Sequence, residues 1–343
     1  SRVAKEFKVG GPSFTLSSEE NSGLRALEVG IRALQEGSIN RAIVGAVDMA
    51  GELRSVLGQQ TALPISSKGR IRPFAPDADG TLIGEGAAAV VLKRLEDAKQ
   101  DGDRIYAVIK GIGTALGGKC ESPQLQGSAY SNALQQVCDD AGTGPAKVGY
   151  LDTAGTGIPH EDQVEAQALG EFFGQQESST PCYIGSVKVD IGHTGAASGL
   201  ASLVKTALSL NQQILPPLRN VDSLRYEWIR GKRRFMLPAG PQFWLRNRAD
   251  GRRQALVSSI GVDGSCSHAL LESYETTAVA SLNRPLGRLA EGLFVLQADS
   301  AAELIGKAGE LRAFAQQRSA TSIDEPAGVW FATSQQTEGK LRL

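Results

Sequence analysis

Short, uninterrupted apolar runs alternate along this chain with longer segments in which apolar residues recur at helical spacing. Residues 42–47 and 87–92 are such runs, and a run of this kind is typical of a strand that is buried on both faces of a sheet. In residues 24–35, leucine and isoleucine recur along one stripe of a helix. Strands that alternate with helices indicate an α/β fold in which helices pack on the faces of sheets.

The two patterns continue to residue 271. Further strands are expected at residues 105–112, 148–151, 182–187, 255–257 and 268–271, and further helices at 131–141, 164–173 and 199–210. After residue 273 the pattern becomes irregular, and then predicts a strand at 293–296 and a helix at 301–316. We therefore expect the last part of the chain to be a linker with a small αβ element of its own.

Composition excludes several classes of function. The 36 basic and 37 acidic residues nearly cancel, so no bulk charge favours a nucleic acid or an acidic membrane as partner. No apolar stretch approaches the roughly 18 residues of a membrane span, and no leader is recognisable. The four cysteines are far apart and histidine is scarce, which argues against a disulfide framework or a metal site. These features predict a cytoplasmic protein.

Five motifs occur in a fixed order over residues 1–272. They are Gly11-Pro12-Ser13-Phe14-Thr15 before a helix, Arg72-Pro73-Phe74 with Asp79-Gly80 and Gly84-Glu85-Gly86, Ala154-Gly155-Thr156-Gly157, Gly185-Ser186-Val187-Lys188 with Ile191-Gly192-His193-Thr194, and Ser258-Ser259-Ile260-Gly261. In order and spacing this series resembles the β-ketoacyl synthase family, whose members have a thiolase-like layered α/β fold with helices on mixed sheets. Against that family, the chain lacks the leading strands and helices, so the resemblance implies a truncated N-terminal half.

The resemblance also implies a mechanism for active members. A cysteine at a helix N-terminus becomes acylated, because the helix dipole and backbone N–H groups stabilise the thiolate and the oxyanion. Two histidines donate hydrogen bonds to a malonyl thioester carbonyl while carbon dioxide leaves, and a lysine holds the second histidine. The carbanion then attacks the acyl cysteine. The substrates are carried on the phosphopantetheine of an acyl carrier protein, and no other cofactor or metal is implied.

Two of these catalytic positions are changed in this chain. The nucleophile position falls on Glu20 and the first histidine on Ala154, whereas Lys188 and His193 are retained. An acyl anhydride on a carboxylate would hydrolyse before a carbanion could attack it. Alanine has no side-chain donor for an oxyanion. No catalytic set is therefore intact, and we expect no condensation.

The pattern resembles a chain-length factor, the silent partner of an active ketosynthase, and most of all the corresponding domain of polyunsaturated fatty acid synthases. Such a domain completes a pseudo-symmetric dimer with the active ketosynthase, shapes the acyl tunnel and works with an acyl carrier protein. An alternative is a decarboxylase that makes starter units from malonyl carrier protein, although such domains keep both histidines. A third possibility is a decayed domain that serves as a spacer.

We expect three regions: residues 1–95 as the remainder of the N-terminal ketosynthase half, 96–272 as the C-terminal half, and 273–343 as an interdomain linker with the small αβ element. Tunnel-lining residues are expected in the loop at 51–64 and near the interface strand. Because the sheet lacks strands and exposes edges, we expect the isolated chain to have low stability.

Single residues allow two interpretations. Glu20 is expected to be an ordinary acid at a helix N-terminus, and the alternative is a carboxylate that mimics the acylated nucleophile or blocks the pocket. Cys266 is a conceivable relocated nucleophile, whereas Cys182 and His268 are expected in the core and His160 in solvent. The basic residues Arg230, Lys232, Arg233 and Arg234 are expected to form a solvated face, or alternatively to contact an acidic carrier protein.

Overall fold

The computed structural model describes residues 2–49, 51–59, 63–117, 125–174, 181–225, 234–245, 251–275, 294–316, 326–327, 329–330 and 341–342. The chain forms two compact units, Ser1–Tyr274 and Glu275–Leu343. All the motifs quoted above lie in the first unit.

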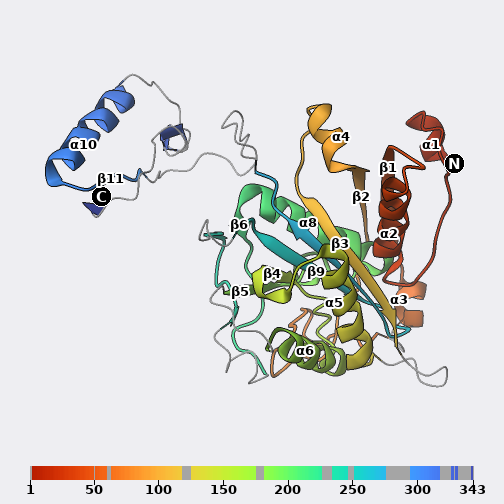
Figure 1. Ribbon diagram of the computed structural model, residues 1–343. Helices are drawn as coiled ribbons and strands as arrows, with labels where there is room; N and C mark the ends of the chain where they lie inside the picture. The colour runs from red at the N-terminus through yellow and green to blue at the C-terminus, as the bar shows by residue number, and fades with distance from the viewer. Residues whose placement is uncertain are drawn as a thin grey trace. The chain divides into compact units, whose positions relative to one another are not determined.

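A six-stranded mixed sheet is the centre of the first unit (Figure 1). Its strands are β3 (Val108–Leu116), β4 (Val148–Asp152), β5 (Cys182–Gly185), β7 (Phe235–Met236), β9 (Gln254–Ile260) and β10 (Ser265–Glu272), in the order β3-β10-β9-β4-β5-β7. The β3–β10 and β10–β9 pairs are antiparallel, and the β9–β4, β4–β5 and β5–β7 pairs are parallel. The expected α/β fold with helices on mixed sheets is confirmed.

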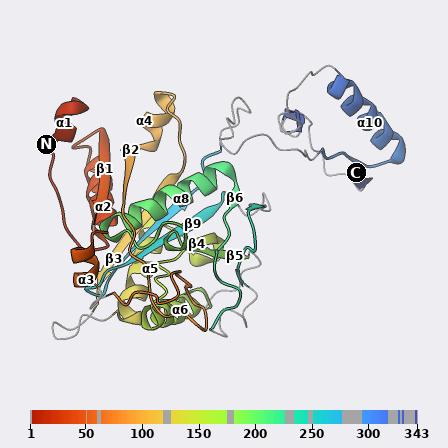
Figure 2. The ribbon, with the colours of Figure 1, turned by 180° about the vertical axis from the view of Figure 1, so that it is seen from behind.

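Helices cover both faces of this sheet. Helices α5 (Gly127–Ala141) and α6 (Pro159–Gly174) share one apolar core with β4 and β5, around Tyr130, Leu134 and Leu169. Helices α2 (Ser22–Gln35) and α8 (Ser198–Gln212) share a second core with β9 and β10, around Leu24 and Leu200. Figure 2 shows the unit from behind, with α8 crossing the sheet. Every strand of the central sheet that carries a motif is therefore buried between helices.

Glycine permits the close approach of α2 to α8. A Cβ atom added at Gly23 would lie 2.9 Å from Leu200 Cγ, and one added at Gly199 would lie 2.8 Å from Leu24 Cγ. Both distances are too short for real side chains, so each helix receives a leucine of the other where it has a glycine. This crossing fixes the N-terminus of α2 against the rest of the unit.

A two-stranded antiparallel sheet of β1 (Arg41–Asp48) and β2 (Gly86–Lys93) packs on the outer side of α2 and α8. The two strands lie at the predicted positions. The prediction that both of their faces are buried is wrong for the described residues. Val44 is buried, whereas Val47 is 62% exposed and Val91 is 73% exposed. The reason is that only the face of Val44 contacts the helices, and no described element covers the face of Val47 and Val91.

Shorter elements connect these layers. They are α1 (Arg2–Glu6), α3 (Leu53–Gln59), α4 (Leu95–Gln100), the 3-10 turns η1 (Pro145–Lys147) and η2 (Gly195–Ala197), α7 (Lys188–Ile191), β6 (Ile214–Leu215) and β8 (Gln242–Phe243). The strand expected at 182–187 ends at Gly185, because the chain turns there into α7. The strand expected at 105–112 runs instead from Val108 to Leu116.

The second unit contains β11 (Gln297–Ala298), α10 (Ala301–Gln316) and β12 (Leu341–Arg342), with β11 antiparallel to β12. Helix α10 has its predicted bounds. Residues 294–296 are not a strand, and the irregular stretch expected from 274 lies, after residue 275, outside the described residues. Among the helices that the structure describes, none has the length and apolar character needed to cross a bilayer.

Candidate functional site

Glu20 lies at the entrance of α2, beside the turn that joins β9 to β10. Asn21, the N-cap residue of α2, donates from Nδ2 to the carbonyl of Ser265 at 3.0 Å and to its Oγ at 2.6 Å. The turn itself is closed by hydrogen bonds from Gly261 N to Ser265 O and from Gly264 N to Gly261 O, both at 2.9 Å. These contacts hold the start of α2 against the turn that follows the last motif of the series.

The carboxylate of Glu20 is directed to this turn. It is 7% exposed, and its Oε2 accepts the backbone N–H of Val262 at 2.8 Å. Burial raises the pKa of Glu20, and hydrogen bonds from the N–H groups of Val262 and of Glu20 itself, together with the charge of Lys188, oppose that rise. The expectation of an ordinary helix N-terminal acid is therefore incomplete, because the carboxylate also bonds to a distant backbone N–H.

Ala154 follows β4 in a loop that a buried carboxylate holds in place. Glu165, on α6, accepts the N–H of Ala154 on Oε1 and the N–H of Gly155 on Oε2, both at 2.9 Å. The hydroxyl of Tyr130 donates to the same Oε1 at 2.8 Å. Ala154 is fully buried and offers only its backbone to the site. Sequence reasoning missed Glu165, although a glutamate on the expected buried face of a helix is a usable signal.

Lys188 is the first residue of α7, and its side chain reaches the loop that contains Ala154. Its Nζ donates to the carbonyl oxygen of Ala154 at 2.8 Å, and its side chain is almost fully buried. Burial lowers the pKa of Lys188, and the charges of Glu165, Glu161, Asp152 and Glu20 oppose this shift. The retained lysine is thus brought together with both altered positions, Glu20 and Ala154.

His193 follows α7 and is held by its backbone in a short bridge to the segment before β2. Its N–H donates to Leu82 O at 2.7 Å, and its carbonyl accepts the N–H of Gly84 at 3.0 Å. The ring Nδ1 accepts the N–H of Gly195 at 3.3 Å, and burial lowers the pKa of His193 to about 3. The imidazole is therefore neutral with its proton on Nε2, where it can donate a hydrogen bond.

Glu161, in the first turn of α6, is a second acid of the site that sequence reasoning missed. Burial raises its pKa, and a hydrogen bond from the Thr156 side chain and the charge of Lys188 oppose the rise. Its charge also raises the pKa of Glu20. Its exposure is intermediate, so only its position two residues after Pro159, at the start of a helix, could have drawn attention to it.

The thiols of the described cysteines are poor nucleophiles. Cys266 is fully buried, and burial raises the pKa of its thiol far above the ordinary value. Burial also raises the pKa of Cys182 to about 12 and that of Cys138 to about 11. The structure thus argues against Cys266 as a relocated nucleophile and agrees with an inert Cys182. Cys120 lies outside the described residues.

The remaining candidates lie away from this group. Arg234 is not on a solvated face, because its guanidinium is buried, donates to the Pro145 carbonyl and lies over the ring of Phe173. Arg230, Lys232 and Arg233 lie outside the described residues. His160 is exposed, as expected.

His268 is fully buried, as expected, and its ring nitrogen Nδ1 lies 3.0 Å from Ser258 Oγ. In the 51–64 loop, residues 60–62 are outside the described residues. The described α3 of that loop exposes Leu53 and Leu57.

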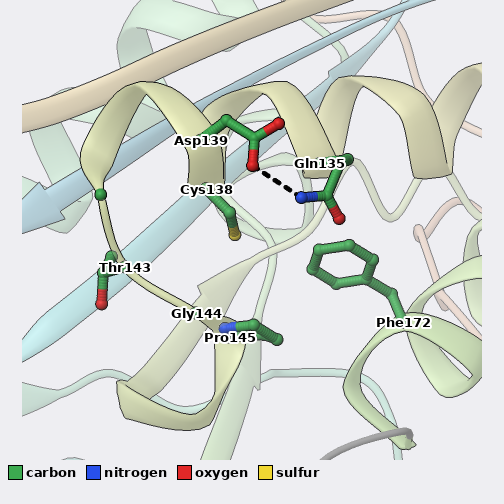
Figure 3. A pocket seen from close by; sticks show the side chains of 8 residues that line it. Gln135, Cys138, Asp139, Thr143, Gly144, Pro145 and Phe172 are labelled. Atoms are coloured by element: carbon green, nitrogen blue, oxygen red, sulfur yellow. Dashed lines mark hydrogen bonds between the residues drawn. The ribbon is translucent and has the colours of Figure 1, made fainter.

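A hollow of about 480 Å³ lies between the C-terminal turn of α5 and α6 (Figure 3). Gln135, Cys138, Asp139, Thr143 and Phe172 line it, and Gln135 Nε2 donates to Asp139 Oδ1 at 2.7 Å. None of the residues Glu20, Ala154, Lys188 and His193 lines this hollow. It is therefore separate from the candidate site.

Taken as chemistry, the site contains a backbone donor at Val262, an imidazole donor at His193 and a buried cation at Lys188. These groups would stabilise an acylated nucleophile at the start of α2. The site has the carboxylate of Glu20 at that position. Such a set can orient a thioester carbonyl, but it lacks an activated thiol or hydroxyl among the described residues that face it.

Two family models and several known proteins match this chain. The Beta-ketoacyl synthase N-terminal domain matches residues 1–98, and the Beta-ketoacyl synthase C-terminal domain matches residues 106–222. The chain is 33% identical over 343 residues to 5-methyl-1-naphthoate synthase of Streptomyces sahachiroi, covering 96% of this chain and 19% of that protein. It is 35% identical over 324 residues to the phthioceranic/hydroxyphthioceranic acid synthase of Mycobacterium tuberculosis, covering 92% of this chain and 15% of that protein.

Solved ketosynthases have the same fold. An oxazolomycin ketosynthase domain of Streptomyces albus JA3453 aligns with a TM-score of 0.75 at 30% identity, covering 92% of this chain and 55% of that one. The ketosynthase of module 1 of the bacillaene synthase of Bacillus amyloliquefaciens FZB42 gives 0.73 at 29% identity, covering 94% and 56%. The chain thus spans little more than half of these structures. It belongs to the β-ketoacyl synthase family and has the thiolase-like fold of that family's ketosynthase domains.

Proposed function

We propose that this chain is a ketosynthase-like domain that does not condense, and that it acts as a chain-length factor. In this role it pairs with an active ketosynthase and shapes the acyl tunnel, while an acyl carrier protein delivers the substrate. Two relatives, the spectinabilin polyketide synthase system protein NorA' of Streptomyces orinoci and the highly reducing polyketide synthase alnA of Emericella nidulans, are named as parts of polyketide synthases, which supports a place in polyketide or fatty acid elongation.

The contact between Glu20 and Val262 carries this proposal. An acylated nucleophile at position 20 would direct its thioester oxygen to backbone N–H groups of this region, and Glu20 Oε2 already accepts the N–H of Val262 at 2.8 Å. The carboxylate therefore satisfies the donor that an acyl oxygen would use. An anhydride formed on Glu20 would also lose its acyl group to water before a carbanion attacked.

Ala154 supports the same conclusion. The residue has no side-chain donor, and its backbone N–H and carbonyl are already bonded to Glu165 and Lys188. Loss of one oxyanion donor lowers a rate by about 10²–10³ in other enzymes. A site with His193 as its only imidazole donor among the described residues is therefore poorly suited to stabilise an enolate.

The proposed tunnel includes the loop at residues 51–64. Its helix α3 presents Leu53 and Leu57 at the surface, with 74% and 58% of each side chain exposed. Apolar side chains that are exposed among the described residues are suited to contact with an acyl chain or with a partner domain. The tunnel, the ketosynthase partner and the carrier protein are parts of the proposal.

Acylation tests the absence of a nucleophile. The chain is incubated with S-butyryl-pantetheine and its intact mass is measured. We expect no adduct on the natural chain and one butyryl group on a Glu20→Cys variant, which restores a thiol beside the Val262 N–H. A stable adduct on the natural chain, mapped to Glu20, would contradict the proposal.

Product length tests the chain-length role. An active ketosynthase is supplied with malonyl carrier protein with and without this chain, and with a Leu53→Ala/Leu57→Ala variant. We expect the natural chain to narrow the distribution of product lengths and the variant to shift it. Products that do not depend on the chain would indicate a spacer.

His193 favours a second candidate, a malonyl decarboxylase, because its Nε2–H is in the form that donates to a thioester carbonyl. Release of carbon dioxide from malonyl carrier protein distinguishes the two. We expect none from the natural chain alone, and we expect an Ala154→His variant to gain some. Release by the natural chain that disappears in a His193→Ala variant would establish the decarboxylase instead. Release that needs the active ketosynthase would place the chemistry in that partner.

A further inference from the structure

We propose that Asp48 is a positioning residue for His193. Through the turn that follows the histidine, it keeps the proton of the imidazole on Nε2, the atom that can donate to a thioester carbonyl. The state of the ring follows from contacts within this chain, and only its use on a thioester rests on the proposed function.

Asp48 is the last residue of β1 and lies opposite Gly86 in the ladder with β2. Side chains two residues apart share one face of a strand, and Val44 and Ala46 of this face pack into the core around α2 and α8. The carboxylate of Asp48 is therefore on the inner face of the small sheet, toward η2, and not on the outer face with Val47.

The carboxylate of Asp48 holds the turn that contains η2. Its Oδ2 accepts the backbone N–H of Ala196 at 3.1 Å, across 148 positions of sequence. Gly195 packs directly on the same carboxylate, because a Cβ atom added there would overlap Oδ2. Within the turn, the N–H of Ala197 donates to the carbonyl of Thr194 at 2.9 Å. Asp48 thus braces this turn from a strand of another sheet.

The same turn supplies the partner of the His193 ring. The N–H of Gly195 donates to Nδ1 at 3.3 Å. An imidazole nitrogen that accepts an N–H has no proton of its own, so the proton of the neutral ring is on Nε2. The backbone of His193 is held separately, by bonds to Leu82 and Gly84. The ring is therefore the part of the residue that depends on the turn.

The carboxylate of Asp48 and the ring of His193 are linked through two adjacent N–H groups. Removal of the carboxylate leaves the Ala196 N–H without this acceptor and opens space against Gly195. The Gly195 N–H then loses its fixed direction toward Nδ1, and an imidazole without a fixed donor there takes its proton on either nitrogen. Asparagine at position 48 keeps an oxygen that accepts the Ala196 N–H, so it preserves the arrangement.

The tautomer of His193 is measured by nuclear magnetic resonance. Long-range ¹H–¹⁵N correlation spectra at pH 7.5 distinguish a protonated from an unprotonated ring nitrogen. The chain has three histidines, so spectra of His160→Asn and His268→Asn variants assign the signals of His193. The spectra are then compared among the natural chain, Asp48→Ala and Asp48→Asn.

We expect Nδ1 of His193 to be unprotonated in the natural chain and in Asp48→Asn. In Asp48→Ala we expect its averaged ¹⁵N shift to move toward that of a protonated nitrogen. Asp140→Ala is the matched control, because Asp140 also accepts a strand N–H, that of Ile112, at 3.0 Å. Its loss lowers stability without reaching the histidine. Should Asp48→Ala fail to fold, Asp48→Ser, whose side chain is too short to reach the Ala196 N–H, takes its place.

Binding of S-butyryl-pantetheine, measured by calorimetry, tests the use of the donor. We expect Asp48→Ala to bind it about threefold more weakly than the natural chain, and Asp48→Asn to bind it equally well. The double variant Asp48→Ala/His193→Ala is expected to bind no more weakly than His193→Ala, because the two residues act through one hydrogen bond. Losses that simply add would show that Asp48 does not act through the histidine.

The inference is overturned if the Nδ1 shift is the same in Asp48→Ala as in the natural chain, or if it moves as far in Asp140→Ala. Failure of the natural chain to bind the butyryl compound overturns the thioester site, and with it the proposed function. That failure leaves the positioning of the ring to be decided by the spectra alone.

Discussion

The carboxylate oxygen Oε2 of Glu20 accepts the backbone N–H of Val262 at 2.8 Å, across 242 positions of sequence. This bond joins the start of α2 to the turn between β9 and β10. The N–H of Val262 in this turn therefore depends on a hydrogen-bond acceptor at position 20.

Replacement of Glu20 tests this bond. In Glu20→Gln the amide oxygen still accepts the Val262 N–H and a buried charge is removed, so we expect the free energy of unfolding at pH 7 to be unchanged or raised. Glu20→Ala leaves the N–H without its acceptor, and we expect a loss of about 1–3 kcal/mol. Urea denaturation measures both, and faster amide exchange at Val262 in the alanine variant localises the effect. Equal stability of the two variants would show that the bond is not formed.

Replacement of Lys188 tests the charge balance. Lys188→Met leaves the buried carbonyl of Ala154 without its donor and removes the charge that lowers the pKa values of Glu20, Glu161 and Glu165, and we expect a loss of about 1–3 kcal/mol at pH 7. Without the lysine these carboxyl pKa values lie further above their unfolded values. Stability from a raised carboxyl pKa is present at low pH and is lost as the pH rises, so the penalty is smaller at pH 5 than at pH 7.

The measurement is a set of urea midpoints at both pH values. Lys68→Met is the matched control, because Lys68 pairs with Asp77 at the surface, and we expect little change from it at either pH. A penalty for Lys188→Met that grows on acidification would contradict the account of the charges.

The sequence predicted the elements of the fold better than it predicted their surroundings. Helix α10 has its expected bounds, and β1 and β2 include the apolar runs at 42–47 and 87–92. Periodicity is a local property, so it locates such elements, but it does not show which faces the rest of the molecule covers. For that reason the burial of β1 on both faces was predicted wrongly.

The site shows the same limit. Resemblance placed Glu20, Ala154, Lys188 and His193, and the structure brings Lys188 into contact with Ala154. The resemblance did not indicate Glu165 or Glu161. Their roles follow from tertiary interactions with the Ala154 loop and with Lys188, which no local pattern shows. The hydrogen bond between Glu20 and Val262 could not be predicted from local patterns either, because the two residues are 242 positions apart in the sequence.

A buried histidine predicts how stability depends on pH. Burial lowers the pKa of His268 to about 3, below its unfolded value of about 6.5. A lowered histidine pKa gives stability that is present above the unfolded value and is lost as the pH falls towards the folded value. We expect His268 to contribute a loss of about 1.4 kcal/mol per pH unit in this window.

His268→Asn removes this contribution and keeps a polar group near Ser258. Urea denaturation at pH 6.5, 5.5 and 4.5 gives the slope of stability against pH for the variant and the natural chain. We expect the variant to have the shallower slope by about one proton per molecule. His160→Asn, at an exposed position, is the control, and parallel curves for all three proteins would refute the assignment.

The outer face of the β1–β2 sheet provides the last prediction. Val47 and Val91 are exposed there, whereas Val44 faces the helices. In Val47→Thr/Val91→Thr the β-branched shape is kept, so we expect unchanged stability and weaker concentration-dependent association in light scattering. Val44→Thr buries a hydroxyl in the core, and we expect it to lower stability by about 1–2 kcal/mol. If the double variant is destabilised as much as Val44→Thr, the outer face is covered in the folded protein and the low stability expected of the isolated chain needs another cause.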